Sequence, residues 1–295
     1  MAASHEDPDI YPFLGGDPAT QARWLAARGY PPATLLALHN ACALRCFFCA
    51  GPGTIEVPAA EVTSAARADA QLAARPAGVH RLLVGGNEPT LHPEFERLLA
   101  AARSAGFLRV DLMTNGAALA TRAADWARHG VAEVVVPLYG ADAHTHDGVV
   151  GSAAFAAVVR GLDAAHHAGI AVRVHTLLLR RTLGQLGALA DLVQRRWGTR
   201  LGVALLRDKG RFDFAAEAPR FAAAAAAVAA VPLHCRPLGI GVPRCLPTVD
   251  EPPPLVAELY FRSQARVFGP GCDACPAARA CGGVVAAYAA EVSSV

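Results

Sequence analysis

The sequence lacks any run of roughly 20 apolar residues, the length that an α-helix needs to cross a bilayer. Its most apolar segments are short and are interrupted by glycine, proline or arginine. Residues 1–12 are acidic and polar, and they contain neither the basic nor the apolar region of a signal peptide. We therefore expect a cytoplasmic protein with no membrane partner, in a compartment that keeps thiols reduced.

The sequence also lacks a cluster of basic residues. The formal net charge is +2 over 295 residues, and acids and bases are mixed along the chain. Nucleic-acid-binding domains usually carry a basic face or stripe, so we do not expect a nucleic acid as partner. Hydrophobic residues make up 53% of the chain, which is enough for one large catalytic domain with a small extension.

No cysteine lies between Cys49 and Cys235, so the eight cysteines of the chain fall into two groups. Three lie within 42–49 and five within 235–281. A disulfide framework is not expected in a reducing compartment. Thiols gathered at two places around a cysteine-free middle indicate two metal sites.

From residue 34 to residue 230, apolar segments alternate with amphipathic ones. The expected strands are 34–39, 79–84, 108–113, 131–139, 170–179 and 201–206. The expected helices are 59–74, 94–105, 120–129, 153–168, 183–196 and 219–230. The strands are apolar without clean alternation, which favours a parallel sheet buried on both faces. Six βα units predict an α/β fold, a partial (β/α)6 TIM-type barrel.

The composition changes after residue 231, where prolines become frequent. We divide the chain into an irregular or helical leader (1–33), the barrel (34–231) and a small Cys-rich C-terminal extension (232–295). In a barrel of this type, functional groups lie at the carboxyl ends of the strands. Polar clusters fall at those ends, at 42–49, 85–90, 114–116 and 144–147.

Cys42, Cys46 and Cys49 form a CxxxCxxC loop after the first expected strand. A [4Fe–4S] cluster normally takes four thiolates, and three in one loop would leave one iron open to a ligand. A zinc knuckle and a redox thiol pair are alternative interpretations. A zinc site would need a fourth ligand nearby, for which His39 is a candidate.

The loop resembles the signature of the radical S-adenosylmethionine (SAM) superfamily, in which the residue before the third cysteine is usually aromatic, as Phe48 is. The resemblance implies a [4Fe–4S] cluster whose open iron chelates the amino and carboxylate groups of SAM. It also implies that the reduced cluster cleaves SAM to methionine and a 5′-deoxyadenosyl radical, which abstracts a substrate hydrogen. A flavodoxin- or ferredoxin-like electron donor would then be a partner. The protein positions the cofactor and excludes water.

Two turns in the barrel resemble segments of the same family. Residues 85–90 (GGNEPT) resemble its GGE segment, and residues 114–116 (TNG) recur there after the third strand. Glycine lets the backbone approach a ligand closely, and the family's first turn accepts hydrogen bonds from the SAM amino group. The resemblance implies cofactor contacts from Phe48, Gly85, Gly86, Asn87, Glu88 and Asn115. The alternative is that both are ordinary turns.

The fourth and fifth strands supply further candidates. Arg173 and His175 are two residues apart on a strand and so share a face. The resemblance implies that they contact the ribose or carboxylate of SAM; on an outward face they would meet solvent or helices. His146 and Asp147 resemble an HD pair followed by a small-residue turn, here Gly151-Ser152, and are the candidate catalytic residues. A solvated loop, with Ser152 as a helix N-cap, is the alternative.

The second cysteine group contains Cys272, Cys275 and Cys281 in a CxxCxxxxxC pattern, and Cys235 and Cys245 lie upstream of it. It resembles the SPASM and shorter twitch extensions, which hold auxiliary [4Fe–4S] clusters. The full SPASM pattern has another cysteine where this chain has Val285. Five thiols cannot fully ligate two cubes, so we expect one auxiliary cluster, held by four of them or by three with an open iron. A zinc ribbon is the alternative.

The resemblance implies a radical SAM oxidoreductase or maturase, and on family grounds we expect it to modify a ribosomally synthesised peptide. Only 41 residues precede Cys42, too few for a typical peptide-binding domain. A peptide would therefore dock directly or need a separate recognition protein. The alternatives are radical oxidation or rearrangement of a small-molecule natural product, such as a sugar or amino-acid derivative, and a non-catalytic iron–sulfur or zinc-binding regulator.

Overall fold

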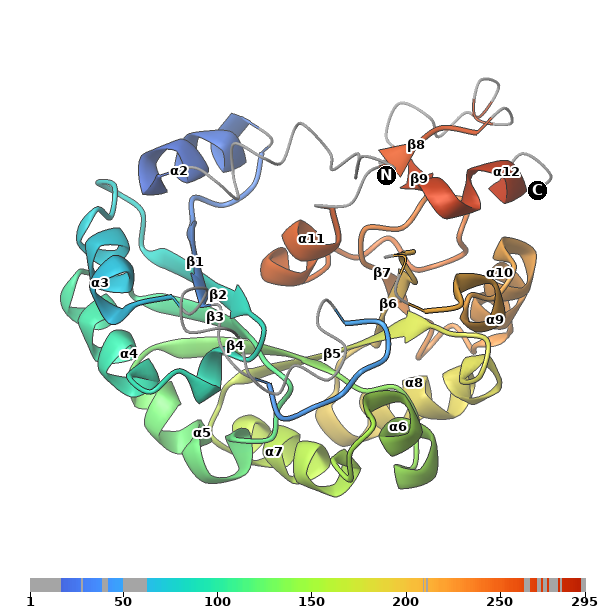
Figure 1. Ribbon diagram of the computed structural model, residues 1–295, viewed down its shortest axis with the longest axis horizontal. Helices are drawn as coiled ribbons and strands as arrows, with labels where there is room; N and C mark the ends of the chain where they lie inside the picture. Colours follow the sequence, from blue (N-terminus) through green and yellow to red (C-terminus); the bar gives the residue numbers. More distant parts are fainter. Residues whose placement is uncertain are drawn as a thin grey trace.

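The computed structural model describes residues 17–27, 29–38, 42–49, 63–208, 210, 212–262, 266–269, 272, 275, 281 and 283–292. Over these residues the core of the fold is a parallel sheet of seven strands that follow one another in chain order. The strands are β1 (Thr34–Leu38), β2 (Arg81–Gly86), β3 (Arg109–Met113), β4 (Val131–Pro137), β5 (Ala171–Leu178), β6 (Gly202–Leu205) and β7 (Leu238–Gly239). The sheet curves into an open arc, as Figure 1 shows.

Helices cover the outer side of this arc (Figure 1). Those of the barrel are α3 (Ala65–Ala73), α4 (Phe95–Ser104), α5 (Leu119–Arg128), α6 (Ala143–Val150), α7 (Phe155–His167), α8 (Leu186–Trp197), α9 (Phe214–Glu217) and α10 (Phe221–Ala230). Helix α2 (Pro18–Ala27) precedes β1, and short 3-10 turns lie at η1 (Pro89–Leu91) and η2 (Leu183–Gln185). The α/β fold expected from the sequence is confirmed.

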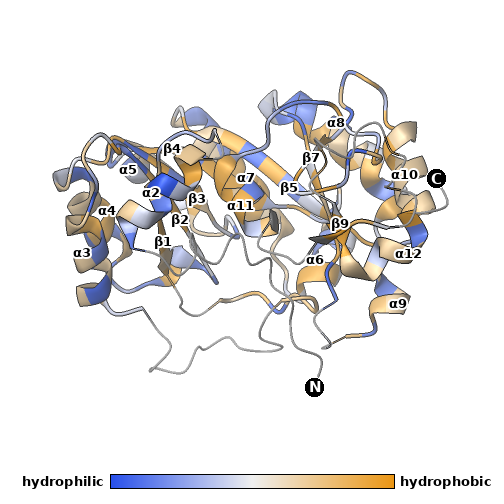
Figure 2. Ribbon diagram, turned by 90° about the horizontal axis from the view of Figure 1, so that it is seen from above, coloured by the Kyte–Doolittle hydropathy of each residue, from blue (hydrophilic) through white to orange (hydrophobic). Residues whose placement is uncertain are grey.

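Burial explains why the strands are apolar. Every residue of β6 is buried, and in β4 the buried positions run without a break from Glu133 to Val136. Strand β1 forms the edge of the sheet and alternates between buried and half-buried residues. Figure 2 shows the apolar residues concentrated on the strands and on the helix faces turned toward them. A parallel sheet covered on both faces produces this pattern.

Each of the six expected strands is present, with ends that differ by a few residues. The expected helices are also present. The first begins at Ala65, because the Ser64 side chain caps it by accepting a hydrogen bond from Arg67 N at 3.2 Å; residues 59–62 of its expected range lie outside the described part. Helix α6 was not expected. The Asp142 carboxylate caps its first turn by accepting a hydrogen bond from Thr145 N at 2.8 Å, and Gly151 ends it with a φ of 64°.

The C-terminal extension returns to the barrel instead of standing apart. Strand β7 pairs with β6, Gly202 opposite Leu238, so a boundary at residue 232 cuts through the sheet. Helix α11 (Leu255–Arg262) lies inside the arc (Figure 1) and packs against β2 and β3. The short elements β8 (Arg266–Val267), β9 (Val284–Val285), η5 (Ala286–Tyr288) and α12 (Ala289–Val292) complete the described extension.

Among the described helices, no single one is long and apolar enough to cross a membrane. Helices α6 and α7 reach that length and composition only together, and a bend of 103° separates them.

Candidate active site

The loop that contains Cys42, Cys46 and Cys49 follows β1 at the carboxyl edge of the sheet. Cys42 and Cys46 are half-buried, and Cys49 is exposed. Burial, together with the negative charges of Cys49 and Cys42, raises the pKa of the Cys46 thiol to about 12. Burial likewise raises the pKa of Cys42, to which the charges of Glu88 and Cys49 add. The three sulfur atoms therefore lie near one another, and they need a cation to become thiolates together.

The turn between α6 and α7 holds this cysteine loop. Arg45 N donates a hydrogen bond to Val150 O at 2.8 Å. Gly151 has a φ of +64°, and a Cβ at this position would meet Arg45 O and Cβ at 3.1 Å each. Ser152 Oγ lies 3.5 Å from Ala43 O. The left-handed backbone of Gly151 and its close approach to Arg45 thus favour glycine at this position, and Ser152 contacts the same loop.

Two aromatic residues anchor the loop to the barrel. The ring of Phe47 packs edge-on against Phe212, with 5.4 Å between centroids, and the Arg181 guanidinium lies 4.8 Å from the Phe47 centroid. The ring of Phe48 packs edge-on against Tyr139, with 5.3 Å between centroids. Phe48 is therefore held in place by the protein, and its contact with a cofactor stays a prediction.

The glycine turn after β2 lies against the end of β1. Gly85 and Gly86 pair with Ala37 and Leu38 in the parallel register. Gly86 has a φ of 137°, and a Cβ there would overlap the carbonyl oxygen of Leu38. Only glycine fits this close approach. Gly86 and Asn87 are exposed at the tip of the turn, where their backbone atoms can meet a ligand.

Glu88 joins this turn to the turn after β3. Its side chain is buried, and Oε1 accepts hydrogen bonds from Thr90 Oγ1 and Thr114 Oγ1, each at 2.6 Å. Its Oε2 accepts a hydrogen bond from Asn115 N at 2.6 Å. Burial raises the pKa of Glu88, and these hydrogen bonds oppose the rise. Both carboxylate oxygens are thus occupied by protein donors, which is typical of a positioning residue.

Asn115 connects the two turns to the cysteine loop. Its Nδ2 lies 3.9 Å from Cys42 Sγ, and its Oδ1 accepts a hydrogen bond from Ala117 N at 2.9 Å. Through Glu88 the GGNEP turn, the TNG turn and the cysteine loop therefore form one connected site. The sequence places these segments at neighbouring strand ends, and the structure brings them into contact.

His146 and Asp147 lie on helix α6 and not in an open loop. His146 is 1% exposed, stacks on Tyr139 and accepts a hydrogen bond at Nδ1 from Tyr139 N at 3.2 Å. Burial lowers its pKa to about 4. Asp147 Oδ1 accepts hydrogen bonds from Ala154 N and Phe155 N. Asp147 therefore caps the first turn of α7, a role that the sequence suggested for Ser152. Both side chains have structural roles, and their catalytic use stays a prediction.

Arg173 and His175 share the inner face of β5. The ring of His175 packs against Phe261 of α11, with 5.5 Å between centroids, and burial lowers the pKa of His175 to about 4. Arg173 is the third residue of β5, near its amino end. Arg173 Nε lies 3.4 Å from Glu133 Oε2 and Nη1 donates to Thr199 Oγ1 at 3.3 Å.

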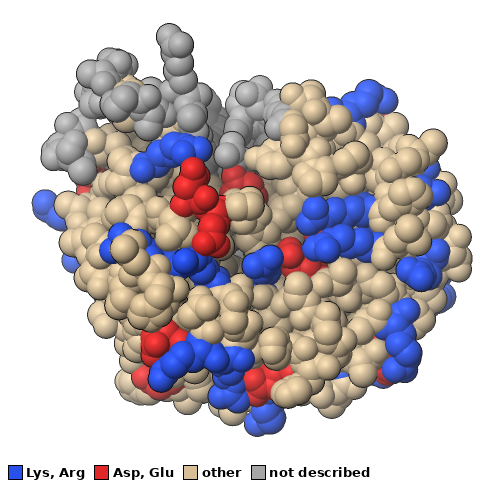
Figure 3. Space-filling model, turned by 180° about the vertical axis from the view of Figure 1, so that it is seen from behind, with Lys and Arg blue, Asp and Glu red and all other residues tan. Residues whose placement is uncertain are grey.

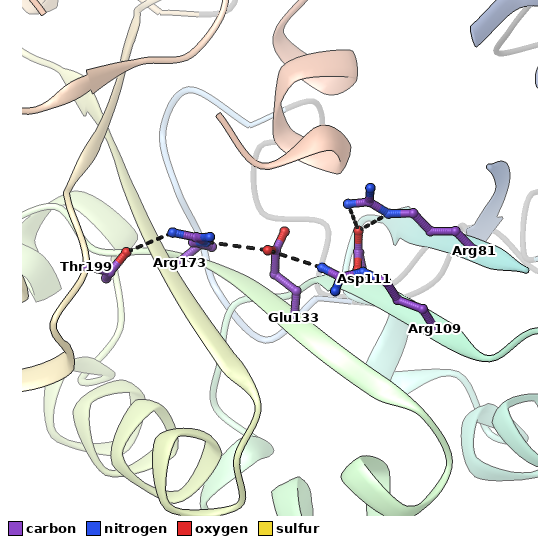
Figure 4. A network of polar contacts seen from close by, with 6 residues as sticks. All are labelled: Arg81, Arg109, Asp111, Glu133, Arg173 and Thr199. Atoms are coloured by element: carbon purple, nitrogen blue, oxygen red, sulfur yellow. Dashed lines mark hydrogen bonds and ion pairs between the residues drawn. The ribbon is translucent and has the colours of Figure 1, made fainter. Parts of the chain in front are cut away.

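Arg173 therefore belongs to a network of ion pairs at the amino-terminal halves of the strands (Figure 4). The network also contains Arg81 and Arg109, which both pair with the buried Asp111. On the face seen in Figure 3, acidic and basic side chains lie side by side around a hollow. These ion pairs satisfy Arg173 at the strand end opposite the cysteine loop, so we leave Arg173 out of the set proposed to contact SAM.

Two tyrosines not singled out from the sequence complete the surroundings of the loop. Burial raises the pKa of Tyr139, and the charges of Cys46 and Tyr260 add to this effect. Tyr260 lies on helix α11, where it is 47% exposed, and the charge of Cys49 is among those that act on it. Helix α11 thus brings Tyr260 near the cysteine loop. A tyrosine ends the fourth strand segment in the sequence, but nothing local in the sequence indicates the placement of Tyr260.

The cysteine loop suits an iron–sulfur cluster, because it carries three thiols and a cube spreads its thiolates over separate irons. Among the described residues, no three His, Cys, Asp or Glu side chains are grouped as a site for one metal ion. His39, the candidate fourth zinc ligand, lies outside the described residues.

Comparison with known proteins finds a matching family model and several similar proteins. The family model described as the radical SAM superfamily matches residues 36–193. The chain is 31% identical over 211 residues to a PqqA peptide cyclase of Streptomyces rochei, covering 66% of this chain and 58% of that protein. It is 35% identical over 130 residues to the mycofactocin maturase MftC of Mycobacterium ulcerans, covering 43% of this chain and 35% of that protein.

Solved structures share the fold. Native anSMEcpe with bound AdoMet superposes with a TM-score of 0.54 at 14% identity, covering 66% of this chain and 57% of that chain. SuiB of Streptococcus suis bound to the precursor peptide SuiA gives a TM-score of 0.50 at 17% identity, covering 64% of this chain and 43% of that chain. The chain spans between about a third and three fifths of the length of the relatives named here.

Proposed function

The chain belongs to the radical SAM superfamily, and we propose that it cleaves SAM reductively and uses the resulting radical to modify a peptide. The observation that carries the proposal is the connection from Cys42 through Asn115 to Glu88. It joins the cysteine loop to the two turns that the family uses for SAM. A regulator that only binds a metal would not need these turns.

The chain's own residues would hold and shield the cofactors. Cys42, Cys46 and Cys49 would hold the [4Fe–4S] cluster, which together with SAM supplies a 5′-deoxyadenosyl radical when both are bound. The exposed backbone at Gly86 and Asn87 would accept hydrogen bonds from the SAM ammonium group, while Glu88 fixes the turn. The aromatic residues against the loop keep water away from this space.

Peptide modification is supported by the relatives. Two of the relatives are named a peptide cyclase and a maturase, and the first matches over 66% of this chain. The SAM cleavage step consumes one electron, so a one-electron donor of the flavodoxin or ferredoxin type would be a partner. A separate peptide-recognition protein would present the peptide if the chain alone binds it weakly.

The test uses the full chain reconstituted anaerobically with iron and sulfide. It is incubated with SAM, dithionite and a synthetic copy of any short peptide that the genes beside its own encode, and the peptide is analysed by mass spectrometry. We expect the peptide to lose hydrogen atoms, and expect no change with Cys46→Ala. The control Arg128→Ala, whose side chain pairs with Asp125 on the outer face of α5, should behave as wild type. Unchanged peptide alongside turnover of a sugar or amino-acid derivative would contradict the peptide proposal.

A further inference from the structure

Five charged side chains meet at the amino-terminal halves of β2 to β5, at the end of the sheet opposite the cysteine loop (Figure 4). Arg81 of β2 lies opposite Arg109 of β3 in the parallel register. Asp111 lies two residues after Arg109 and opposite Glu133 of β4, so these side chains share one face of the sheet. Arg173 of β5 joins them by its contact with Glu133. The inner face of a barrel is usually filled by apolar side chains, so a group of charges there indicates a function beyond packing.

This network carries more positive than negative charge. Three guanidinium groups meet only two carboxylates, those of Asp111 and Glu133. Asp111 is fully buried, and its two oxygens accept hydrogen bonds from Arg81 Nε at 2.6 Å and from Arg109 Nε at 2.7 Å. One positive charge remains, which a carboxylate with its single negative charge balances. A phosphate dianion would exceed it and would meet repulsion from Glu133.

The part of the network that is open to solvent lies at Arg109 and Arg173. Both guanidinium groups approach Glu133 Oε2, each at 3.4 Å, which is longer than the ~2.7–2.9 Å of a strong charged hydrogen bond. Their side chains are 41% and 42% exposed. Within the described part of the chain, no hydrogen bond reaches Arg109 Nη1 or Arg173 Nη2. Two half-exposed guanidinium groups that converge in this way are suited to bind the two oxygens of a carboxylate.

Glu133 lacks a donor on its other oxygen. The residue is 5% exposed, and its buried Oε1 has no hydrogen-bond partner among the described residues. Figure 4 shows this oxygen free of the dashed contacts that reach the neighbouring Oε2. A buried carboxylate oxygen without a donor costs free energy, so a ligand that brings an N–H group to Glu133 would stabilise the network.

We propose that this network binds a carboxylate that has an N–H group on the neighbouring carbon, as in the C-terminal residue of a peptide or in a free α-amino acid. Arg109 and Arg173 donate to the carboxylate oxygens, and Glu133 Oε1 accepts a hydrogen bond from the N–H group. Arg173 lies five residues before Leu178, the last residue of β5, which is about 17 Å of extended strand. The bound group is therefore an anchor and not the group that reacts. Only its role as an anchor for a substrate rests on the proposed function.

Calorimetric titration of small probes into the reconstituted wild-type chain tests the site without any variant. SAM is present without a reductant, so that it occupies the open iron. The probes are N-acetylglycine, glycine, acetate, which lacks the N–H group, N-acetylglycinamide, which lacks the carboxylate, and inorganic phosphate. We expect N-acetylglycine to bind at least roughly tenfold more tightly than acetate, and N-acetylglycinamide not to bind. Tighter binding of glycine than of N-acetylglycine would identify a free amino acid as the ligand, and the reverse order a peptide C terminus.

Variants show where the probes bind. Arg109→Gln and Arg173→Gln each remove one guanidinium group and should weaken the binding of N-acetylglycine or glycine at least roughly tenfold. Arg128→Ala, on the outer face of α5, should bind as wild type does. Wild-type affinity in both glutamine variants, no binding of N-acetylglycine or glycine to wild type, or tighter binding of phosphate than of either would overturn the proposal. If a variant folds poorly, the probe series on wild type still decides. These titrations involve no SAM cleavage, so absence of 5′-deoxyadenosine would refute the proposed function and leave the binding result intact.

Discussion

Glu88 Oε1 accepts a hydrogen bond of 2.6 Å from Thr114 Oγ1, and this contact joins the carboxyl ends of β2 and β3. The two residues are 26 positions apart in the chain. Because the same carboxylate also binds Asn115 N, it sets the position of the asparagine beside Cys42. We therefore expect Glu88 to act on SAM through the two turns and not by contact with its own oxygens.

Replacing Glu88 by glutamine should weaken SAM binding. The amide nitrogen of Glu88→Gln would face either Asn115 N–H or the donors of Thr90 and Thr114, and one donor would lose its partner. Loss of a hydrogen bond to a charged group costs ~1.5–3 kcal/mol, so we expect SAM affinity to fall at least roughly tenfold. Isothermal titration of SAM into the reconstituted enzyme measures this change.

Glu96→Gln is the matched control for this variant, because Glu96 is exposed on α4 and pairs with Arg122 on the surface. The control should bind SAM as wild type does, and both proteins should carry the same iron content. Unchanged SAM affinity in Glu88→Gln would show that the two turns are held without this carboxylate.

Gly151→Ala should disturb the cysteine loop. The new Cβ would press on Arg45 O and Cβ, and the φ of +64° is unfavourable for alanine by ~1–2 kcal/mol. We expect a lower midpoint of thermal unfolding and incomplete incorporation of the SAM-binding cluster. Gly148→Ala is the control, since a Cβ at this helical position meets nothing within 4 Å. Equal iron content and equal midpoints in the two variants would contradict the docking role of Gly151.

Glu133 should make the protein less stable as the pH rises. Burial and the nearby charge of Asp111 raise the pKa of Glu133 despite the opposing charges of Arg173 and Arg109. The Glu133 carboxyl group thus binds its proton more tightly in the folded state than in the unfolded state. The protonated carboxyl group therefore contributes to the free energy of unfolding, and this contribution is lost as pH rises through the pKa of the folded state. Glu133→Gln should show a smaller loss of stability between pH 5 and about pH 8 in urea titrations. An unchanged pH dependence would contradict this account.

His175 should act in the opposite direction. Burial lowers its pKa from 6.5 to about 4, so the folded state binds the proton less tightly and stability is lost as pH falls between these values. The contribution is on the order of 3 kcal/mol. His175→Leu should therefore lose less stability in urea between about pH 7 and pH 5 than wild type. His144→Leu is the control, because it alters an exposed histidine, and it should keep the pH dependence of wild-type stability. An equal change of unfolding free energy with pH in wild type and both variants would contradict the role of His175.

The sequence predicts the barrel well because its strands are buried on both faces and are continuously apolar. Helix α6 escapes such a prediction, because its residues 143–147 (AHTHD) contain few apolar side chains. Its local signals are only the two end residues, Asp142 as N-cap and Gly151 at the C-terminal end. The placement of α11 inside the arc depends on packing against β2 and β3, which no local pattern encodes.

In the candidate site too, local motifs are predictable from the sequence and long-range contacts are not. The cysteine loop and the two turns are found from the sequence, since each is a short motif at a strand end. What each side chain does there depends on partners distant in the chain. Glu88 becomes a positioning residue through Thr114 and Asn115. Arg173 joins an ion network because Glu133 lies beside it on the neighbouring strand.

The most direct test of the central claim is the formation of 5′-deoxyadenosine by the reconstituted full chain with SAM and dithionite, measured by liquid chromatography and mass spectrometry. The account predicts 5′-deoxyadenosine and methionine in equal amounts from wild type, and none from variants in which Cys42, Cys46 or Cys49 is replaced by alanine. An iron-loaded wild type that binds SAM but forms no 5′-deoxyadenosine, or a Cys46→Ala variant that forms as much as wild type, would contradict it.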